Sequence, residues 1–133
     1  MSVGPTLAVT GSTGRLGGRV ARLLAAANMQ QRLVVRNPAR APRLDAAQIA
    51  VAEYGDAGAS RRALDGMRTV FMVSGSETPD RVAKHRAFVD AAAAAGVEHV
   101  VYVSFYGAAA DANFTLARDH WSTEQHICAS GLR

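Results

Sequence analysis

The sequence predicts an α/β fold: a doubly wound parallel sheet with helices on both faces. Short apolar runs, which are typical of buried parallel strands, alternate with segments whose apolar residues recur at helical spacing. Strands that alternate with helices in this way form a parallel sheet whose crossover helices cover its faces. The chain has 133 residues, the size of one domain with one core, and no internal repeat or low-complexity linker divides it.

Each element follows from its local pattern. The expected strands are Leu7–Thr10, Leu33–Val35, Ile49–Ala52, Thr69–Val73 and Val97–Ser104. The expected helices are Arg15–Ala27, Ala57–Asp65, Asp80–Ala95 and Ala117–Ala129. Pro38 ends the second strand because proline cannot join a central ladder, and Gly96 closes the third helix. A further strand would follow the last helix of such a sheet, so we expect residues 1–133 to be a domain that is incomplete at its C-terminus.

The composition, with 49% apolar and 20% charged residues, is that of an ordinary globular protein. The longest apolar runs are far shorter than the roughly 20 residues that a membrane span needs. The N-terminal segment lacks the basic and apolar pattern of a secretory signal. Cys128 is the single cysteine, which excludes an internal disulfide and a cysteine-based metal cluster. We therefore expect a cytoplasmic protein without a metal site.

The formal net charge of +4 allows two interpretations. A basic domain attracts the phosphates of nucleic acids, but a basic surface also serves an anionic small ligand, or has no specific role. The positive charges are scattered along the chain, and nearly all belong to arginines, with Lys84 the one lysine. This distribution disfavours a nucleic-acid partner.

The first strand and the first helix are joined by a glycine-rich turn. It has the pattern Gly-x-x-Gly-x-x-Gly and consists of Thr10, Gly11, Ser12, Thr13, Gly14, Arg15, Leu16 and Gly17. Gly11 permits a sharp turn, Gly14 permits close approach of the backbone to a pyrophosphate, and Gly17 permits tight helix packing. The free N–H groups and the dipole of the helix N-terminus attract an anion, and the hydroxyls of Ser12 and Thr13 add donors.

An ordinary tight turn between a strand and a helix has similar glycines. The position of this one, at the first such junction of a series, favours a dinucleotide-binding, Rossmann-type domain.

The end of the second strand indicates which dinucleotide is preferred. An NAD site places a carboxylate there for the ribose 2′-hydroxyl, whereas this chain has Arg36, followed by Asn37 and Arg40. A guanidinium suits a 2′-phosphate, and Arg15 offers a second cation. We therefore expect NADP(H) to be preferred over NAD(H), the alternative being that Arg36 is a solvated surface residue.

The loops after the next strands reach the same edge of the sheet. Asp56 follows the third strand, where its carboxylate either accepts a hydrogen bond from the adenine amino group or caps the following helix. The loop after the fourth strand is expected to run beside the adenosine ribose and the pyrophosphate, and it consists of Ser74, Gly75 and Ser76.

On these residues the chain resembles the NmrA-like group of atypical short-chain dehydrogenases, and within it the type 2 NAD(P)H:quinone oxidoreductases. The stretches that carry the resemblance are VTGSTGRLGGRV, LVVRNPARA, YGDAGASRRALDGM, VSGSE, KHRAFVDAAAAAGVEHVVYVSF and LARDHWSTEQHICASGL. The resemblance implies an NADPH-dependent oxidoreductase that transfers hydride directly to a quinone-like acceptor. Members of the group are about twice as long, so the resemblance also implies that the last strands and a substrate-binding lobe are absent here.

The Tyr-x-x-x-Lys pair of ordinary short-chain dehydrogenases is absent. By resemblance, His120 lies on the helix that faces the nicotinamide ribose, with Glu124 one turn away to orient it. Ser104 stands where the group's catalytic serine is usually found. His120 and Ser104 are thus the candidate catalytic residues. The alternatives are that His120 is a partly buried histidine bonded to the backbone and that the Ser104 hydroxyl caps a loop.

The missing pair is also compatible with a second function, a non-catalytic redox sensor that binds NADP(H) and contacts a regulatory protein. The similarity of the stretch DHWSTEQHICASGL to the quinone oxidoreductases favours the enzyme. The expected partners are a quinone-like small molecule and either a second copy of the chain or a regulatory protein.

Overall fold

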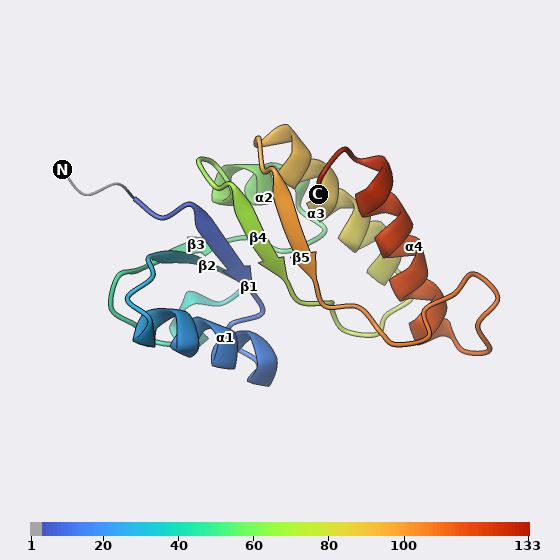
Figure 1. Ribbon diagram of the computed structural model, residues 1–133, viewed down its shortest axis with the longest axis horizontal. Helices are drawn as coiled ribbons and strands as arrows, with labels where there is room; N and C mark the ends of the chain where they lie inside the picture. Colours follow the sequence, from blue (N-terminus) through green and yellow to red (C-terminus); the bar gives the residue numbers. More distant parts are fainter. Residues whose placement is uncertain (1–3) are drawn as a thin grey trace.

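The computed structural model describes residues 4–133, and Figure 1 shows the strands and helices in chain order. The strands are β1 (Leu7–Thr10), β2 (Gln31–Val35), β3 (Ala47–Val51), β4 (Thr69–Met72) and β5 (His99–Tyr102). The helices are α1 (Arg15–Ala26), α2 (Ala57–Ala63), α3 (Arg81–Ala94) and α4 (Thr115–Ala129), and a short 3₁₀ turn, η1, spans Pro38–Arg40. Every strand and helix expected from the sequence is present.

The strands form one parallel sheet in the order β3-β2-β1-β4-β5. Val9 of the central strand β1 lies opposite Leu33 of β2 on one side and Phe71 of β4 on the other. The chain leaves β1 toward β2 and β3, then crosses back past β1 to β4 and β5. This reversal defines a doubly wound, Rossmann-type sheet and confirms the expected fold class.

Helices cover both faces of this sheet, with α1 on one side and α2, α3 and α4 on the other (Figure 1). Successive side chains of a strand point to opposite faces, so the sheet contributes to two buried clusters, one on each face. The cluster under α1 is small and consists of Val9, Ala21, Leu33 and Val35. The larger cluster, against the other helices, includes Leu64, Val70, Met72, Phe88, Val89 and Ile127. Most of the core therefore lies between the sheet and α2, α3 and α4.

The face on the α1 side is open over β5. Val101 of β5 is 43% exposed, whereas its neighbour Val100 is buried in the larger cluster. The backbone of Arg133 runs beside β5: its N–H donates to the Glu98 carbonyl at 3.0 Å, and its carbonyl accepts from the Val100 N–H at 2.8 Å. Arg133 thus bonds to Glu98 and Val100, the two residues on either side of the one that it faces, and this is the hydrogen-bond pattern of a parallel ladder.

The ends of several elements differ from expectation, most clearly at β5, which was expected to span Val97–Ser104. Val97 instead belongs to the end of α3, because its N–H donates to the Ala92 carbonyl at 3.0 Å. Gly96 precedes it with a positive φ of 88°, so these two residues close the helix. Helix α4 begins at Thr115, two residues before the expected start.

Within residues 4–133, no helix combines the length and the apolar character that a membrane crossing would require.

Candidate functional site

The carboxyl ends of β1, β2, β3 and β4 open into a cavity of about 440 Å³. Its wall is formed by the loops after these strands and by three side chains of α3, namely Arg81, Lys84 and His85. Ligands of open α/β sheets bind at this edge, beside the point where the strand order reverses. The volume lies within the range of small-molecule sites. This cavity is the candidate functional site.

The structure brings most of the predicted site residues to this cavity. Those that line it are Thr10, Gly11, Thr13, Gly14, Arg36, Ser74, Gly75 and Ser76. Those that lie outside its lining are Ser12, Arg15, Leu16, Gly17 and Asp56.

The glycine-rich turn is too tightly packed for side chains at two positions. Gly11 has a φ of +67°, and a Cβ there would lie 2.8 Å from the Cβ of Val73. A Cβ at Gly17 would lie 2.1 Å from the carbonyl oxygen of Gly11, so α1 begins directly against the turn. At Gly17 the contact is with a backbone carbonyl, which cannot give way as a flexible side chain can, and at Gly11 the positive φ also disfavours any residue with a Cβ.

The N-terminus of α1 is available to an anion. Its N-cap, Gly14, has no side chain that could accept from the N–H groups of the first turn. The backbone amides of Arg15, Leu16 and Gly17 therefore have no side-chain acceptor at the N-cap, and the positive end of the helix dipole lies there. Ser12 is buried, and its hydroxyl has no hydrogen-bond partner within the described residues.

Three cations of the described residues line the cavity, of which Arg81 is paired with Asp119 and the other two are Arg36 and Lys84. Arg36 follows β2, is exposed, and makes no hydrogen bond or ion pair within residues 4–133. Lys84 lies on α3, where its stem packs near Gly55 and its ammonium pairs with Asp80 at 3.2 Å. The part of the cavity beside β2 is thus suited to a negatively charged group.

The side chain of Tyr54 is hydrogen-bonded to the start of the loop after β4. Its hydroxyl donates to the carbonyl of Val73 and lies 2.6 Å from the Oγ1 of Thr10. The Thr10 hydroxyl in turn accepts from the Val73 N–H at 2.9 Å. Burial raises the pKa of Tyr54 well above its ordinary value, so the phenol keeps its proton. The hydroxyl of Thr10 is therefore engaged in positioning the loop.

Asp56 occupies the N-cap of α2, where its carboxylate accepts from the Ala59 N–H at 3.0 Å. This is the second of the two roles that the sequence left open. Glu53 and Gly55, its neighbours in the loop after β3, line the cavity in its place.

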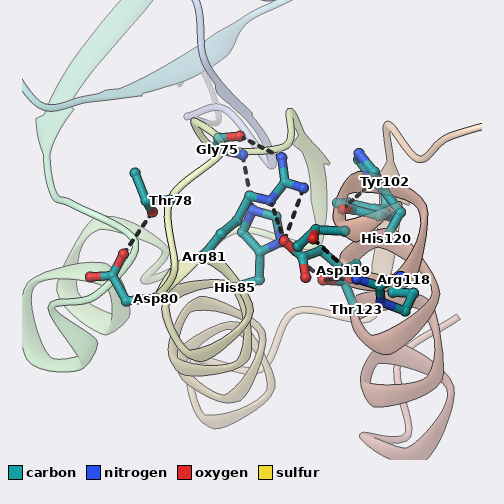
Figure 2. Close-up of polar contacts among 11 residues, drawn as sticks. Gly75, Thr78, Asp80, Arg81, His85, Tyr102, Arg118, Asp119, His120 and Thr123 are labelled. Carbon is teal, nitrogen blue, oxygen red and sulfur yellow. Dashed lines mark hydrogen bonds and ion pairs between the residues drawn. The ribbon is translucent and has the colours of Figure 1, made fainter. Parts of the chain in front are cut away.

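The loop after β4 is held by side chains of α3, as Figure 2 shows. The Gly75 N–H donates to Nε2 of His85 at 2.9 Å, and Nη1 of Arg81 donates to the Gly75 carbonyl at 3.4 Å. Arg81 also forms a buried ion pair with Asp119 of α4 at 3.1 Å. Burial is the main cause that lowers the pKa of His85 to about 4, and the Arg81 charge adds to it.

The two candidate catalytic residues lie beyond this group, at the end of β5 and on α4. Nδ1 of His120 lies 2.7 Å from the hydroxyl of Tyr102, and the ring of Phe105 stacks on the imidazole. The Ser104 hydroxyl donates to the Glu124 carboxylate at 2.5 Å. The expectation that Glu124 orients His120 is therefore wrong: the partner of His120 is Tyr102, which the fold brings from β5.

His120 is buried, being 4% exposed, and neither it nor Ser104 is among the residues that line the cavity. Burial lowers the pKa of His120, and it raises the pKa of Tyr102 to about 12. Both groups are therefore neutral near pH 7.

The cavity residues that sequence reasoning missed include Tyr54, Arg81, Lys84 and His85. Tyr54 could have been found, since it directly precedes Gly55 and Asp56 in a loop at the correct edge. The spacing of Arg81 and His85, four residues apart at the start of α3, places both on one helix face. Their direction toward Gly75 depends on how α3 packs and has no local signal.

Comparison with known proteins assigns the family. The sequence profile of the NAD(P)H-binding family matches residues 11–132. The chain belongs to this NAD(P)H-binding family. The domain is 38% identical over 130 residues to quinone oxidoreductase 2 of Escherichia coli K12, which covers 95% of the chain and 45% of the relative. It is 34% identical over 126 residues to an NAD(P)H azoreductase of Xenophilus azovorans, covering 93% and 44%.

Solved structures agree with this assignment. The E. coli NADPH-dependent quinone oxidoreductase QOR2, complexed with NADPH, matches the domain with a TM-score of 0.86 and 36% identity over 95% of this chain and 46% of that one. The transcriptional regulator NmrA matches with a TM-score of 0.80 over 96% and 43% but is 17% identical, which shows the fold alone. The resemblance to NmrA-like proteins and quinone oxidoreductases is confirmed. The NAD(P)H-binding chain spans about half the length of these relatives.

The residues present fit NAD(P)H. The turn at Gly11 and Gly17 has no room for a Cβ, and α1 has no side-chain cap. These are the features that a pyrophosphate needs at the start of a helix. Arg36 supplies positive charge beside the end of β2, where the adenosine ribose of a dinucleotide is held in this fold, and Lys84 lines the same cavity.

Proposed function

We propose that this chain is the cofactor-binding part of an NADPH-dependent oxidoreductase that transfers hydride directly to a quinone-like acceptor. The observation that carries the proposal is Arg36, a cation without a partner within residues 4–133 that lines the cavity where an NAD site has a carboxylate. The similarity to a quinone oxidoreductase and an azoreductase supports an electron-poor acceptor.

The chain's own residues account for binding. The amides at the start of α1 receive the pyrophosphate, and the Arg36 guanidinium receives the 2′-phosphate. Lys84, from α3, adds a second charge to the cavity lining. The loop from Ser74 to Ser76 forms one wall of the cavity.

Bound NADPH supplies a hydride, and the quinone that takes it up becomes a hydroquinone when its oxygen gains a proton. In this proposal His120 and Ser104 face the acceptor. Because His120 is neutral near pH 7, it acts as a hydrogen-bond donor to the acceptor oxygen rather than as an imidazolium acid. The Tyr102 hydroxyl, donating to Nδ1, would keep the proton of His120 on Nε2. The proton of the product then comes from water or through this pair.

Calorimetric titration of the chain with NADPH and with NADH tests the cofactor assignment. We expect NADPH to bind more tightly, and Arg36→Glu to weaken NADPH binding by about 100-fold, since it replaces a charge-assisted pair by repulsion. NADH binding should change little. Arg40→Glu is the matched control, because it makes the same charge change in the same loop at a residue outside the cavity lining. Equal affinities for the two cofactors, or an unaltered preference in Arg36→Glu, would overturn the assignment.

Hydride transfer is tested on the same sample by following the loss of NADPH absorbance with 1,4-benzoquinone.

A second candidate function is an NADP(H)-binding redox sensor. It is favoured by one observation, that His120 and Ser104 lie outside the cavity lining. Oxidation of NADPH that saturates with quinone supports the enzyme. Tight NADPH binding without turnover supports the sensor.

A further inference from the structure

Both backbone polar groups of Gly75 are bound by side chains rather than by a neighbouring strand. Its N–H donates to Nε2 of His85 at 2.9 Å, and its carbonyl accepts from Arg81 at 3.4 Å. Arg81 and His85 are one turn apart on α3 and point to the same residue, Gly75, whose two flanking peptide groups they bind (Figure 2). Gly75 lies in the middle of the loop that forms one wall of the cofactor cavity.

The same two side chains reach α4 on their other side. Nδ1 of His85 lies 2.9 Å from the hydroxyl of Thr123, which donates to the Asp119 carbonyl at 3.0 Å. Arg81 donates from Nε and Nη2 to the carboxylate of Asp119 at 3.2 and 3.1 Å. Two pairs of residues, each one turn apart, thus face each other across α3 and α4. We call Arg81, His85, Asp119 and Thr123 the Gly75 clamp.

The direction of each hydrogen bond in the clamp is determined. The Gly75 N–H can only donate, so Nε2 of His85 must accept and the ring proton must lie on Nδ1, toward Thr123. The Thr123 hydroxyl then accepts from His85 and donates its own O–H to the Asp119 carbonyl. His85 fits this arrangement because it is 1% exposed and neutral. Each polar group of the clamp has a partner, as a buried network requires.

We propose that the Gly75 clamp is a positioning device for the cofactor: His85 and Arg81 fix the loop after β4 against the bound NAD(P)H and tie it to α4. His85 and Arg81 act here through the backbone of Gly75. The clamp connects the cofactor wall to the helix that carries His120, so the cofactor loop and the candidate acceptor side of the site are held in one register. The proposal rests on NAD(P)H binding and does not depend on the acceptor.

The competing explanation is that His85 serves only the packing of α3 on α4. Two variants of His85 distinguish this explanation from positioning of the loop. In His85→Gln, Oε1 takes the place of Nε2 and can still accept from the Gly75 N–H, while the bond to Thr123 is lost. In His85→Asn, the shorter amide takes the place of Nδ1 and can reach Thr123, while the bond to Gly75 is lost. Each variant loses one hydrogen bond and the imidazole ring, and the smaller Asn leaves the larger gap, so thermal unfolding of both variants measures what packing contributes.

The experiment uses the 133-residue chain, NADP⁺ as the probe, and NMR of the Gly75 amide. We expect His85→Asn to weaken NADP⁺ binding by about tenfold, as the loss of one ordered hydrogen bond would, and His85→Gln to stay within about threefold of the unmodified chain. The Gly75 amide proton should resonate downfield in the unmodified chain and in His85→Gln, and should move upfield in His85→Asn. Thermal unfolding monitors the fold of each variant.

Equal NADP⁺ affinities of the two variants would overturn the proposal, as would an upfield Gly75 amide in the unmodified chain. An unmodified chain that binds no NADP⁺ would overturn it together with the proposed function. Equal affinities for NADPH and NADH would overturn only the proposed NADPH preference and leave the contrast between Gln and Asn intact.

Discussion

Tyr54 and Thr10, 44 residues apart in the chain, meet with 2.6 Å between their hydroxyl oxygens and bind both backbone polar groups of Val73. Tyr54 follows β3, Thr10 is the last residue of β1, and Val73 follows β4. The three strand ends at the floor of the cavity are therefore joined by side-chain hydroxyls where the backbone ladder stops. The loop that begins at Val73 continues directly into the Gly75 clamp.

Tyr54→Phe should lower the free energy of unfolding by about 1–3 kcal/mol, because it leaves the Val73 carbonyl without its buried donor. It should also weaken NAD(P)H binding, since Val73 and Gly75 belong to one wall of the cavity. Urea unfolding and calorimetric titration measure the two effects. Tyr106→Phe is the control: Tyr106 is fully exposed, and the same loss of a hydroxyl should leave both quantities unchanged. Equal effects of the two variants would show that the hydroxyl of Tyr54 does not hold the loop.

Gly17→Ala should abolish measurable NAD(P)H binding and destabilise the chain. Its Cβ would lie 2.1 Å from the Gly11 carbonyl oxygen, so α1 must move away from the turn. Gly58→Ala makes the same change inside α2, where the nearest atom belongs to the flexible Arg62 side chain, 3.4 Å away. There we expect a gain of about 0.5–1 kcal/mol, from the better helix propensity of alanine. Circular dichroism and cofactor titration of both variants check this; a Gly17→Ala chain that binds normally would contradict it.

Stability should fall as the pH drops from about 6.5 toward 4, and His85 should account for part of the loss. Burial lowers the pKa of the folded His85 from 6.5 to about 4. Between these values the unfolded chain binds a proton that the folded chain does not, so its contribution is complete above pH 6.5 and is lost as the pH approaches the folded pKa. The contribution amounts to about 3 kcal/mol.

Urea unfolding across this pH range measures the effect. His85→Gln should show a shallower fall, because the amide does not titrate. His99→Gln, which changes an exposed histidine at the start of β5, should keep the slope of the unmodified chain. A His85→Gln curve parallel to that of the unmodified chain would contradict the assignment of the slope to His85.

The 133-residue chain should self-associate through the uncovered side of β5. Val101 is 43% exposed there, and the apolar rings of Phe105 and Tyr106 follow it at 37% and 101% exposure. Apolar side chains exposed on the face of a sheet invite contact with another chain. Sedimentation velocity at increasing concentration should show oligomers that Val101→Lys reduces, whereas Val51→Lys at the opposite edge should reduce them less. A monomer at all concentrations would refute this prediction.

The fold class and the phosphate-binding turn follow from the sequence because their signals are local. Each strand is an apolar run that ends in a turn residue, and Gly11 and Gly17 mark a turn that only small residues permit. Arg36 was found by counting from that turn to the end of the next strand. These features depend on the backbone path of single βα units, and a short window of sequence determines that path.

The tertiary structure decided which partner each polar side chain has. Glu124 binds Ser104 instead of His120, and Asp56 caps α2 instead of lining the cavity. The His85–Thr123 contact joins residues 38 positions apart, through helices whose mutual packing no local pattern specifies. Burial then sets the protonation state of His85, and so whether it can accept from Gly75. The sequence by itself determined the glycine-rich turn and the edge of the sheet where we predict a dinucleotide, whereas the packing of α3 on α4 decided which side chains hold the loop after β4, because hydrogen-bond partners and desolvation depend on contacts between distant segments.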